Sequence, residues 1–306
     1  MGASPLFPPV YQNEESAKEA LLHVIRREPR CLDVEQTRWT LESLLPQISD
    51  FRLSGPSSLW HLLDRLGIHW LRGREHVHSP DPLYQPKRTF IEQIDHRVCA
   101  SEGREILVYQ DECSYDRQPS LACAYAATRD PVRAERSHQS NTQTRIAGVL
   151  NAHTGAVQAI SGSKVGIKQL VELYRQVCEA YPAVQRIWLV QDNWPVHFHP
   201  DVLVALEAQE CPFPFPRPGN WPDEPSPAAC KRWGAWHLPV QLVVLPTYAS
   251  WCNPIEKLWR MLKQEILHLH RQADDLHGLR QRVMAFLQQF AHGSLPLLRY
   301  VGLLPN

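Results

Sequence analysis

The order of apolar segments after residue 104 constrains the fold of this 306-residue chain more than any other feature. Four short apolar runs separated by polar turns come first and are typical of strands in a meander: residues 105–110, 122–128, 144–150 and 156–160. Strand and helix patterns then alternate, with strands at 186–191 and 240–246 and helices at 165–181, 200–209, 253–270 and 274–291. This order predicts an α/β fold in which a mixed sheet is covered by helices.

A separate helical region precedes the sheet. The spacing of apolar residues predicts helices over 15–30 and 34–47, and a third helix that is capped by Ser57 and ends at Gly67. Helix, glycine-containing turn, short helix and then a basic segment is the order of a helix-turn-helix with a small wing. The DNA-binding helix would then present these side chains: Ser57, Ser58, Trp60, His61 and Arg65. The same pattern also suits an ordinary small helical bundle.

These patterns predict a division of the chain into a helix-turn-helix region at 1–78, a linker at 79–100 and an α/β domain at 101–306. The linker is expected because residues 78–90 are polar and rich in proline, and a short helix follows them. An insertion is expected at about 211–236, where seven prolines between 212 and 227 exclude a regular element. The side chains expected to anchor this insertion are Trp221, Trp233 and Trp236.

Composition excludes several classes of protein. The eight cysteines form no Cys-x-x-Cys pair, so we expect reduced thiols and neither a disulfide framework nor structural zinc. There is no apolar run of membrane-spanning length and no signal-peptide pattern, which predicts a cytosolic protein without a membrane partner. The 32 basic and 32 acidic residues argue against a protein that coats nucleic acid by bulk charge. Local basic stretches at 52–74 and 257–263 leave DNA binding open.

Three carboxylates stand at corresponding places in predicted core elements. Asp111 and Asp192 each directly follow a predicted buried strand, and Glu256 lies in the first turn of the helix over 253–270. Neighbouring strand ends and a packed helix can bring such groups to one spot at the edge of the sheet. There they could hold two Mg²⁺ ions about 4 Å apart and support phosphoryl transfer.

Each carboxylate also has a plainer interpretation. The two aspartates could be polar turn residues. Glu256 could complete a capping box with Asn253 as the N-cap and Pro254 in the first helical position. It could equally form an ordinary i,i+4 pair with Arg260 on a solvated helix face that also carries Lys263. The joint placement of the three carboxylates favours the metal site over these alternatives.

Three segments of the sequence form a recognisable set: QDECSY at 110–115, QDNWPVH at 191–197 and LPTYASWCNPIEKLWRMLK at 245–263. They resemble the DDE transposases of the mariner superfamily, in particular those of bacterial insertion sequences. The last segment carries the most specific match, an Asn-Pro-Ile-Glu run followed by Trp259, Leu262 and Lys263. The resemblance extends over nearly the whole chain from about residue 35.

The resemblance implies a ribonuclease H-like fold, two Mg²⁺ or Mn²⁺ ions, and cut-and-paste movement of DNA through terminal inverted repeats. It implies DNA partners, both transposon ends and target, and a homodimer in the complex, associated with the nucleoid when bound. Asp111, Asp192 and Glu256 would be the catalytic, metal-binding triad. The residues implied to support the triad or to contact DNA are Glu112, Asn193, His197, Arg260 and Lys263.

The chain departs from the family pattern in three places. The gap between Asp192 and Glu256 holds 63 residues, longer than usual, and the proline-rich insertion accounts for the excess. The segment TYASWCN lacks the usual Ser-Pro, and one helix-turn-helix unit is predicted where two are common. Two alternatives therefore stay open: an inert, domesticated or N-terminally shortened DNA-binding relic, and a stand-alone ribonuclease H-like nuclease.

Overall fold

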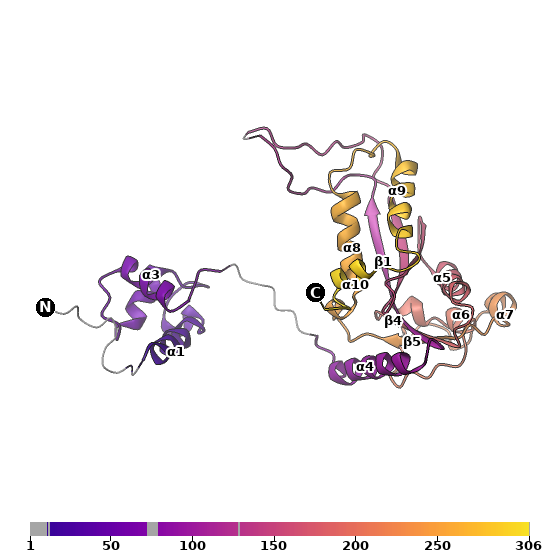
Figure 1. The fold of residues 1–306 in the computed structure, drawn as a ribbon, viewed down its shortest axis with the longest axis horizontal. Coiled ribbons are helices and arrows are strands. Elements are labelled where there is room, and N and C mark those ends of the chain that lie inside the picture. Colours follow the sequence, from indigo (N-terminus) through magenta and orange to yellow (C-terminus); the bar gives the residue numbers. More distant parts are fainter. Residues whose placement is uncertain (1–10, 12, 72–78, 128, 306) are drawn as a thin grey trace. The chain divides into compact units, whose positions relative to one another are not determined.

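The computed structural model describes residues 11, 13–71, 79–127 and 129–305. The chain divides into two compact units, Met1–His76 and Val77–Asn306, called here the N-terminal and the C-terminal unit (Figure 1). Within the described residues no helix is both long and apolar enough to cross a membrane. The predicted boundary at residue 78 falls in the stretch 72–78, which lies outside the described residues.

The N-terminal unit is built from short helices around a small apolar core. Its helices are α1 (Glu14–Ile25), α2 (Leu41–Leu44) and α3 (Pro56–Arg65), with 3₁₀ turns at Pro29–Leu32 and Leu45–Ile48. The helix predicted over 34–47 is wrong for its first half. The Thr40 hydroxyl accepts the N–H of Ser43 at 3.1 Å and caps a helix that begins only at Leu41.

Both ends of α3 are set by local backbone contacts. The predicted cap at Ser57 is wrong, because the hydroxyl of Ser58 accepts the N–H of Gly55 at 3.0 Å. At the other end Gly67 adopts a φ of +67°, and the N–H of Ile68 reaches the carbonyl of Leu63 at 2.8 Å. This left-handed termination is the one predicted for Gly67. No strand that could form a wing occurs in the described part of this unit, and the rest of the predicted wing falls on residues 72–78.

The C-terminal unit contains one mixed sheet of five strands. The strands are β1 (Glu105–Asp116), β2 (Gln143–Asn151), β3 (Val157–Gly162), β4 (Arg186–Gln191) and β5 (Val240–Val244). Their order is β3-β2-β1-β4-β5, in which β1 pairs antiparallel with β2 and parallel with β4. The predicted mixed sheet is therefore confirmed.

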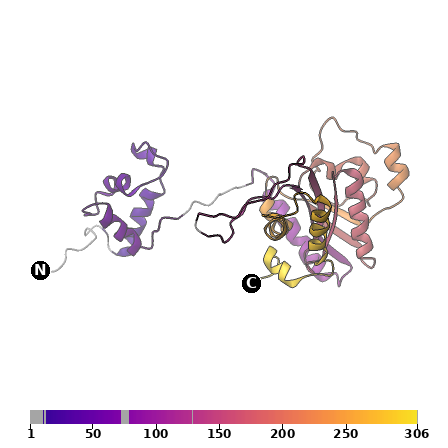
Figure 2. The same ribbon diagram turned by 90° about the horizontal axis from the view of Figure 1, so that it is seen from above.

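The strand predicted over 122–128 does not form. Residues 117–127 and 129–142 instead extend beyond the end of β1 as a long excursion from the sheet (Figures 1 and 2). Leu121 is 80% exposed and Tyr125 is fully exposed, so these side chains are not packed against the rest of the unit as those of a sheet strand would be.

Helices cover both faces of the sheet (Figure 1). On one face α5 (Ile167–Ala180), α6 (Pro200–Leu203) and α7 (Pro227–Trp233) pack against the strands. On the other lie α4 (Tyr84–Ala100), α8 (Ile255–Leu262), α9 (Leu276–Gln288) and α10 (Leu295–Val301), the last of which the sequence did not predict. Successive side chains of each strand point alternately into these two layers, because residues in a strand alternate between the faces of the sheet.

The predicted linker at 79–100 is wrong for most of its length, because Tyr84–Ala100 is a continuous helix of the C-terminal unit. Its buried side chains, Ile91, Ile94 and Val98, recur at helical spacing and pack against Leu107 and Trp188 of the sheet. The polar composition of 78–90 concealed this pattern, which starts only at Ile91.

Two other predicted elements differ in length. The helix predicted over 200–209 ends at Leu203, because the chain turns and Leu206 pairs with Leu238 in an isolated bridge. The insertion at 211–236, predicted without a regular element, contains α7, which begins with Pro227 and is capped by Ser226. Its Trp233 is buried, and Trp236 packs on the same core. The ring of Trp221 contacts His199, so all three tryptophans have partners.

Candidate active site

Asp111, Asp192 and Glu256, far apart in the sequence, line one cavity of about 350 Å³. Asp111 comes from β1, Asp192 directly follows β4, and Glu256 is in the first turn of α8. The rest of the wall is the segment after β5 together with two asparagines: Asn193, Leu245, Pro246, Thr247, Tyr248, Ala249, Ser250 and Asn253. The structure thus brings together the three carboxylates that the sequence singled out.

Asp111 lies inside β1 and not after it, because this strand continues to Asp116. Its side chain points to the α8 side of the sheet, where Trp259 donates its indole N–H to Oδ2 at 3.0 Å. Burial, together with the charges of Glu256 and Glu112, raises the pKa of Asp111 to about 8. The indole fits there because the residue opposite Asp111 on β2 is Gly148, which has no side chain. A Cβ at that position would lie 2.6 Å from Trp259 Cη2.

The pKa of Asp192 is shifted in the opposite direction to that of Asp111. Its Oδ1 accepts the N–H of Trp194 at 2.9 Å and lies 3.2 Å from Nε2 of the fully buried His197. Burial raises the pKa of Asp192, but His197 and the N–H of Trp194 lower it by more, so the net shift is downward. His197 therefore lies directly beside the triad, where the resemblance implied a supporting residue.

Glu112 approaches the same ring nitrogen of His197 as Asp192 does. Its Oε1 accepts from Gln110 Nε2 at 2.8 Å and lies 3.7 Å from His197 Nε2. Burial raises the pKa of Glu112, and His197 acts in the opposite direction. One potential ligand atom from each of Glu112, Asp192 and His197 lies within 4.8 Å of the other two. Glu112 thus extends the acidic cluster behind Asp192.

The capping-box interpretation of Glu256 is wrong. The amide of Asn253 does not cap α8 but donates to the carbonyl of Gln110 in β1 at 3.2 Å. Glu256 is left exposed in the first helical turn, facing the cavity. Burial and Asp192 raise the pKa of Glu256, against the opposing charges of Lys263 and Arg260. Within residues 79–127 and 129–305 no ion pair forms between Glu256 and Arg260.

The other predicted residues fall around this cavity. Asn193 lines it and donates to the carbonyl of Leu245 at 2.8 Å, which ties the end of β4 to the end of β5. Arg260 and Lys263 are exposed and line an adjoining cavity of about 380 Å³, which shares Glu256 with the first. Two cations therefore stand one and two turns along α8 from a carboxylate of the triad.

A buried ion pair braces the wall of the cavity, and the sequence gave no sign of it. Asp81 Oδ2 lies 2.8 Å from Lys87 Nζ and accepts the N–H of Thr247 at 2.8 Å. Although burial opposes ionisation, the lysine and the N–H groups of Thr247 and Leu83 lower the pKa of Asp81 to about 2. Ser79 donates its hydroxyl to the carbonyl of Thr247 as well. The segment read as a linker thus holds the loop after β5.

Tyr248 stands at the rim of the cavity. It adopts a φ of +54°, in the left-handed region that non-glycine residues rarely occupy, and its side chain is 78% exposed. A strained backbone that presents an aromatic ring to solvent at the mouth of a site is a common feature of ligand-binding loops. In the sequence, Tyr248 stands out only as part of the motif at 245–263.

The residues predicted on the DNA-binding helix lie on α3, in the other unit. Ser57, His61 and Trp60 are exposed, and the Trp60 and His61 rings meet edge to face at 4.8 Å. Ser58 uses its hydroxyl in the helix cap, and Arg65 is paired with Glu14 of α1. Three of the five side chains are thus presented outward, and two have structural partners.

The donor set of the cavity fits divalent cations of the Mg²⁺ and Mn²⁺ type. Such ions prefer carboxylate oxygens, and three carboxylates line the cavity. Because the pKa of Asp111 is raised to about 8, placing negative charge on all three carboxylates at once is unfavourable. A bound cation would relieve this repulsion.

Known proteins share this architecture. Residues 106–280 match the family described as DDE superfamily endonuclease. The "Insertion element IS630 uncharacterized 39 kDa protein" of Shigella sonnei is 22% identical over 273 residues, which cover 88% of this chain and 69% of that protein.

Solved structures with a similar fold include the "Mos1 transposase paired-end complex with left transposon end", at a TM-score of 0.57 and 14% identity, covering 100% of this chain and 79% of that one. The "Crystal structure of the Mos1 mariner paired end complex with Mn" matches at a TM-score of 0.57 and 15% identity, covering 98% of this chain and 78% of that one. These likenesses confirm the ribonuclease H-like fold that the sequence resemblance implied.

Proposed function

The chain belongs to the DDE superfamily endonucleases, which confirms the resemblance carried by its three motifs, and we propose that it is a DNA transposase. It binds terminal inverted repeats through the N-terminal unit. The C-terminal unit cleaves the DNA strands there and joins them to a target. The curated relative from an insertion element and the transposase complexes of similar fold support this reading.

The observation that carries the proposal is the convergence of three carboxylates on one cavity from three separate elements. Asp111, Asp192 and Glu256 have no common structural task there. The pKa of Asp111 is raised by burial and by the charges of Glu256 and Glu112. The pKa of Glu256 is raised by burial and by the charge of Asp192. Such crowding of carboxylates is unfavourable unless a cation is bound. Functional sites are where such clustering is retained.

Asp111, Asp192 and Glu256 are the residues that would hold two divalent ions. When bound, two such ions supply an activated oxygen nucleophile and stabilise the leaving oxygen of an in-line displacement at phosphorus. A structure of the Mos1 paired end complex was obtained with Mg and another with Mn, which is consistent with the same ions here.

Neighbouring side chains orient the ligands. Trp259 donates its indole N–H to Oδ2 of Asp111 and so fixes the rotation of that carboxylate. His197 and the N–H of Trp194 do the same for Asp192. Such outer contacts hold ligands in place before the ion binds.

The DNA strand would approach along α8. Arg260 and Lys263 stand beside Glu256 on an exposed cavity wall and can bind the phosphates on either side of the cleaved bond. Tyr248, which lines the neighbouring cavity of the carboxylates, offers an exposed ring on which an unpaired base can stack. These residues would position the scissile phosphate and do not themselves carry out the chemistry.

Recognition of the transposon ends is assigned to the exposed face of α3, with Trp60, His61 and Ser57 toward the DNA. Bringing two ends together requires two copies of the chain, so the working complex is a homodimer. The relatives of similar fold that are described as paired-end complexes support this assembly.

The test is cleavage of end-labelled DNA that carries the ends of the element encoding this chain, in Mg²⁺ or Mn²⁺. We expect wild type to cleave, and Asp192→Asn to lose at least about a thousandfold in rate. The matched control is Asp116→Asn, at an exposed aspartate on the same strand as Asp111 and outside the cavity, which should cleave like wild type.

The outcomes separate the alternatives. Binding of the ends without cleavage by folded wild-type protein would identify an inert relic or a regulator. Cleavage without joining to target DNA would identify a stand-alone nuclease. Cleavage that survives in Asp192→Asn would overturn the assignment of the triad.

A further inference from the structure

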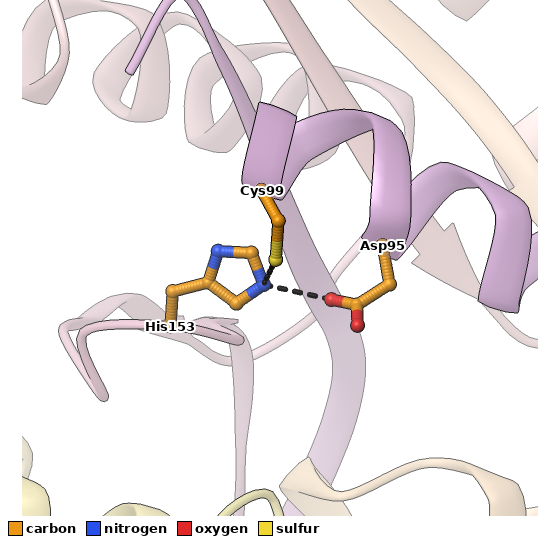
Figure 3. Close-up of side chains that lie close together, drawn as sticks. All are labelled: Asp95, Cys99 and His153. Carbon is orange, nitrogen blue, oxygen red and sulfur yellow. Dashed lines mark hydrogen bonds and ion pairs between the residues drawn. The ribbon is translucent and has the colours of Figure 1, made fainter. Parts of the chain in front are cut away.

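A second group of potential metal ligands lies outside the catalytic cavity. Asp95, Cys99 and His153 each place one ligand atom within 4.8 Å of the others (Figure 3). Among the described residues, the other such group is the one formed by Glu112, Asp192 and His197 at the cavity. The sequence gave no sign of the surface cluster, because its cysteine and histidine are 54 residues apart and match no spacing motif.

Two rigid elements present the three side chains. Asp95 and Cys99 are one helical turn apart on α4, which is fixed to the sheet by Ile94 and Val98. His153 lies in the turn between β2 and β3, whose backbone is held by the buried side chain of Asn151. Oδ1 of that residue accepts the N–H groups of His153 at 2.9 Å and Thr154 at 3.0 Å. The cluster is therefore preorganised.

Both partners of the histidine converge on the same ring nitrogen (Figure 3). Asp95 Oδ1 lies 2.7 Å and Cys99 Sγ 4.0 Å from Nε2 of His153. In a nucleophilic Cys-His-Asp relay the thiol and the carboxylate use different ring nitrogens. A single proton on Nε2 cannot serve both neighbours well, whereas one metal ion bound there can take all three donors.

We propose that Asp95, Cys99 and His153 bind one zinc-class divalent ion, which clasps the C-terminal half of α4 to the β2–β3 turn. Thiolate, imidazole and carboxylate together are the ligand set of Zn²⁺, with solvent as the fourth ligand. Tetrahedral Zn²⁺ bonds would place these ligand atoms roughly 3.3–3.6 Å apart, which small side-chain rotations provide. Binding releases the thiol proton to solvent. The site is chemically distinct from the oxygen-lined catalytic cavity.

Cobalt is the probe, because a Co²⁺–thiolate bond gives a charge-transfer band in the near ultraviolet that carboxylate sites lack. The full reduced chain is titrated with Co²⁺ in the Asp192→Asn background, which removes one ligand of the catalytic cavity. We expect a band that saturates at one equivalent and is displaced by Zn²⁺. Cys99→Ser should abolish it, and His153→Ala should weaken Zn²⁺ binding at least about tenfold.

The matched control is Cys230→Ser, at another exposed cysteine, which should keep the band. Zn²⁺ should raise the Tm of the background protein but not that of its Cys99→Ser form. All these positions are exposed, so the metal-free variants should unfold at the same temperature as their parent. Absence of the band, or an unchanged band in Cys99→Ser, would show that Asp95 and His153 form only a surface ion pair and would overturn the proposal.

Discussion

The cavity of the C-terminal unit is assembled from distant parts of the chain, whereas the exposed face of α3 is built within one short segment. At the cavity, the contact of Trp259 with Asp111 spans 148 residues and that of Thr247 with Asp81 spans 166. On α3, the cap and the termination join residues no more than five apart. Long-range contacts couple the chemistry to the stability of the whole unit, while local ones leave α3 free to change. The two regions should therefore fail independently when they are mutated.

Among single substitutions, the largest effect on stability should follow from removing the buried ion pair of Asp81 and Lys87. Asp81→Ala leaves Lys87 buried without its partner, and we expect the free energy of unfolding of the C-terminal unit to fall by about 3–5 kcal/mol. Because the pKa of Asp81 is lowered to about 2, its contribution is present above pH ~4 and is lost as pH falls through 2.

Chemical denaturation at pH 7, followed by the fluorescence of the buried Trp188 and Trp259, measures this loss. Asp223→Ala is the control, since that side chain is 99% exposed and its removal should change stability little. Equal stability of the two variants would break the comparison, because the cavity wall would then not depend on its distant brace.

A smaller effect should come from crowding the indole that holds Asp111. Gly148→Ala puts a Cβ 2.6 Å from Trp259 Cη2, which we expect to destabilise the unit by about 1–3 kcal/mol. Displacement of Trp259 also releases Oδ2 of Asp111, so cleavage should slow by more than the fraction of unfolded protein explains.

The control is Gly162→Ala near the end of β3, where the nearest atom to an added Cβ is a backbone oxygen at 3.4 Å. Rates and stability are measured on the same preparations. A Gly148→Ala protein as fast as wild type would show that Trp259 only packs there and does not position Asp111.

The metal-free protein should lose stability as pH rises. Burial and the neighbouring Glu256 and Glu112 raise the pKa of Asp111 to about 8, so between pH ~4 and pH ~8 the folded state holds a proton that the unfolded state releases. Unfolding free energy should fall over that window by at most about 1.4 kcal/mol per pH unit. Thermal melts in chelator measure the slope.

Asp111→Asn should flatten this slope and Asp116→Asn should not. Added Mg²⁺ should flatten it too, because the bound cation favours the charged carboxylates. A wild-type protein whose stability in chelator does not change from pH 5 to pH 8 would contradict the burial and charge crowding ascribed to Asp111.

The smallest change in the fold should come from α3. Trp60→Ala and His61→Ala remove exposed side chains, so we expect the Tm to change little while affinity for transposon-end DNA falls by about tenfold. Equilibrium binding at fixed salt concentration, with an unrelated duplex as competitor, measures the specific part. Undiminished affinity in the double variant would assign recognition of the ends to another surface.

The sequence predicted what depends on local periodicity and missed what depends on long-range contact. Short apolar runs identified β2, β4 and β5 within one or two residues, and the acidic residue near each strand end led to Asp111 and Asp192. The run at 122–128 carries the same local pattern as a strand, yet its residues 122–127 join no sheet, and Tyr125 is fully exposed.

Asn253 shows why a local rule can be overridden. It precedes Pro254 and Glu256 in the order of a capping box, but its amide instead reaches the carbonyl of Gln110, 143 residues away. Asp81 is the converse case, a polar residue in a proline-rich stretch that becomes the buried partner of Lys87. Neither contact leaves a trace in the neighbouring sequence.

Metal-ion rescue tests the central assignment most directly, by asking whether Asp192 touches a catalytic ion. Asp192→Cys replaces a carboxylate oxygen by sulfur, which Mg²⁺ accepts poorly and Mn²⁺ accepts better. We expect this variant to bind transposon-end DNA like wild type, to fail to cleave it in Mg²⁺ and to recover cleavage in Mn²⁺. Cleavage by Asp192→Cys in Mg²⁺ at the wild-type rate would contradict the assignment.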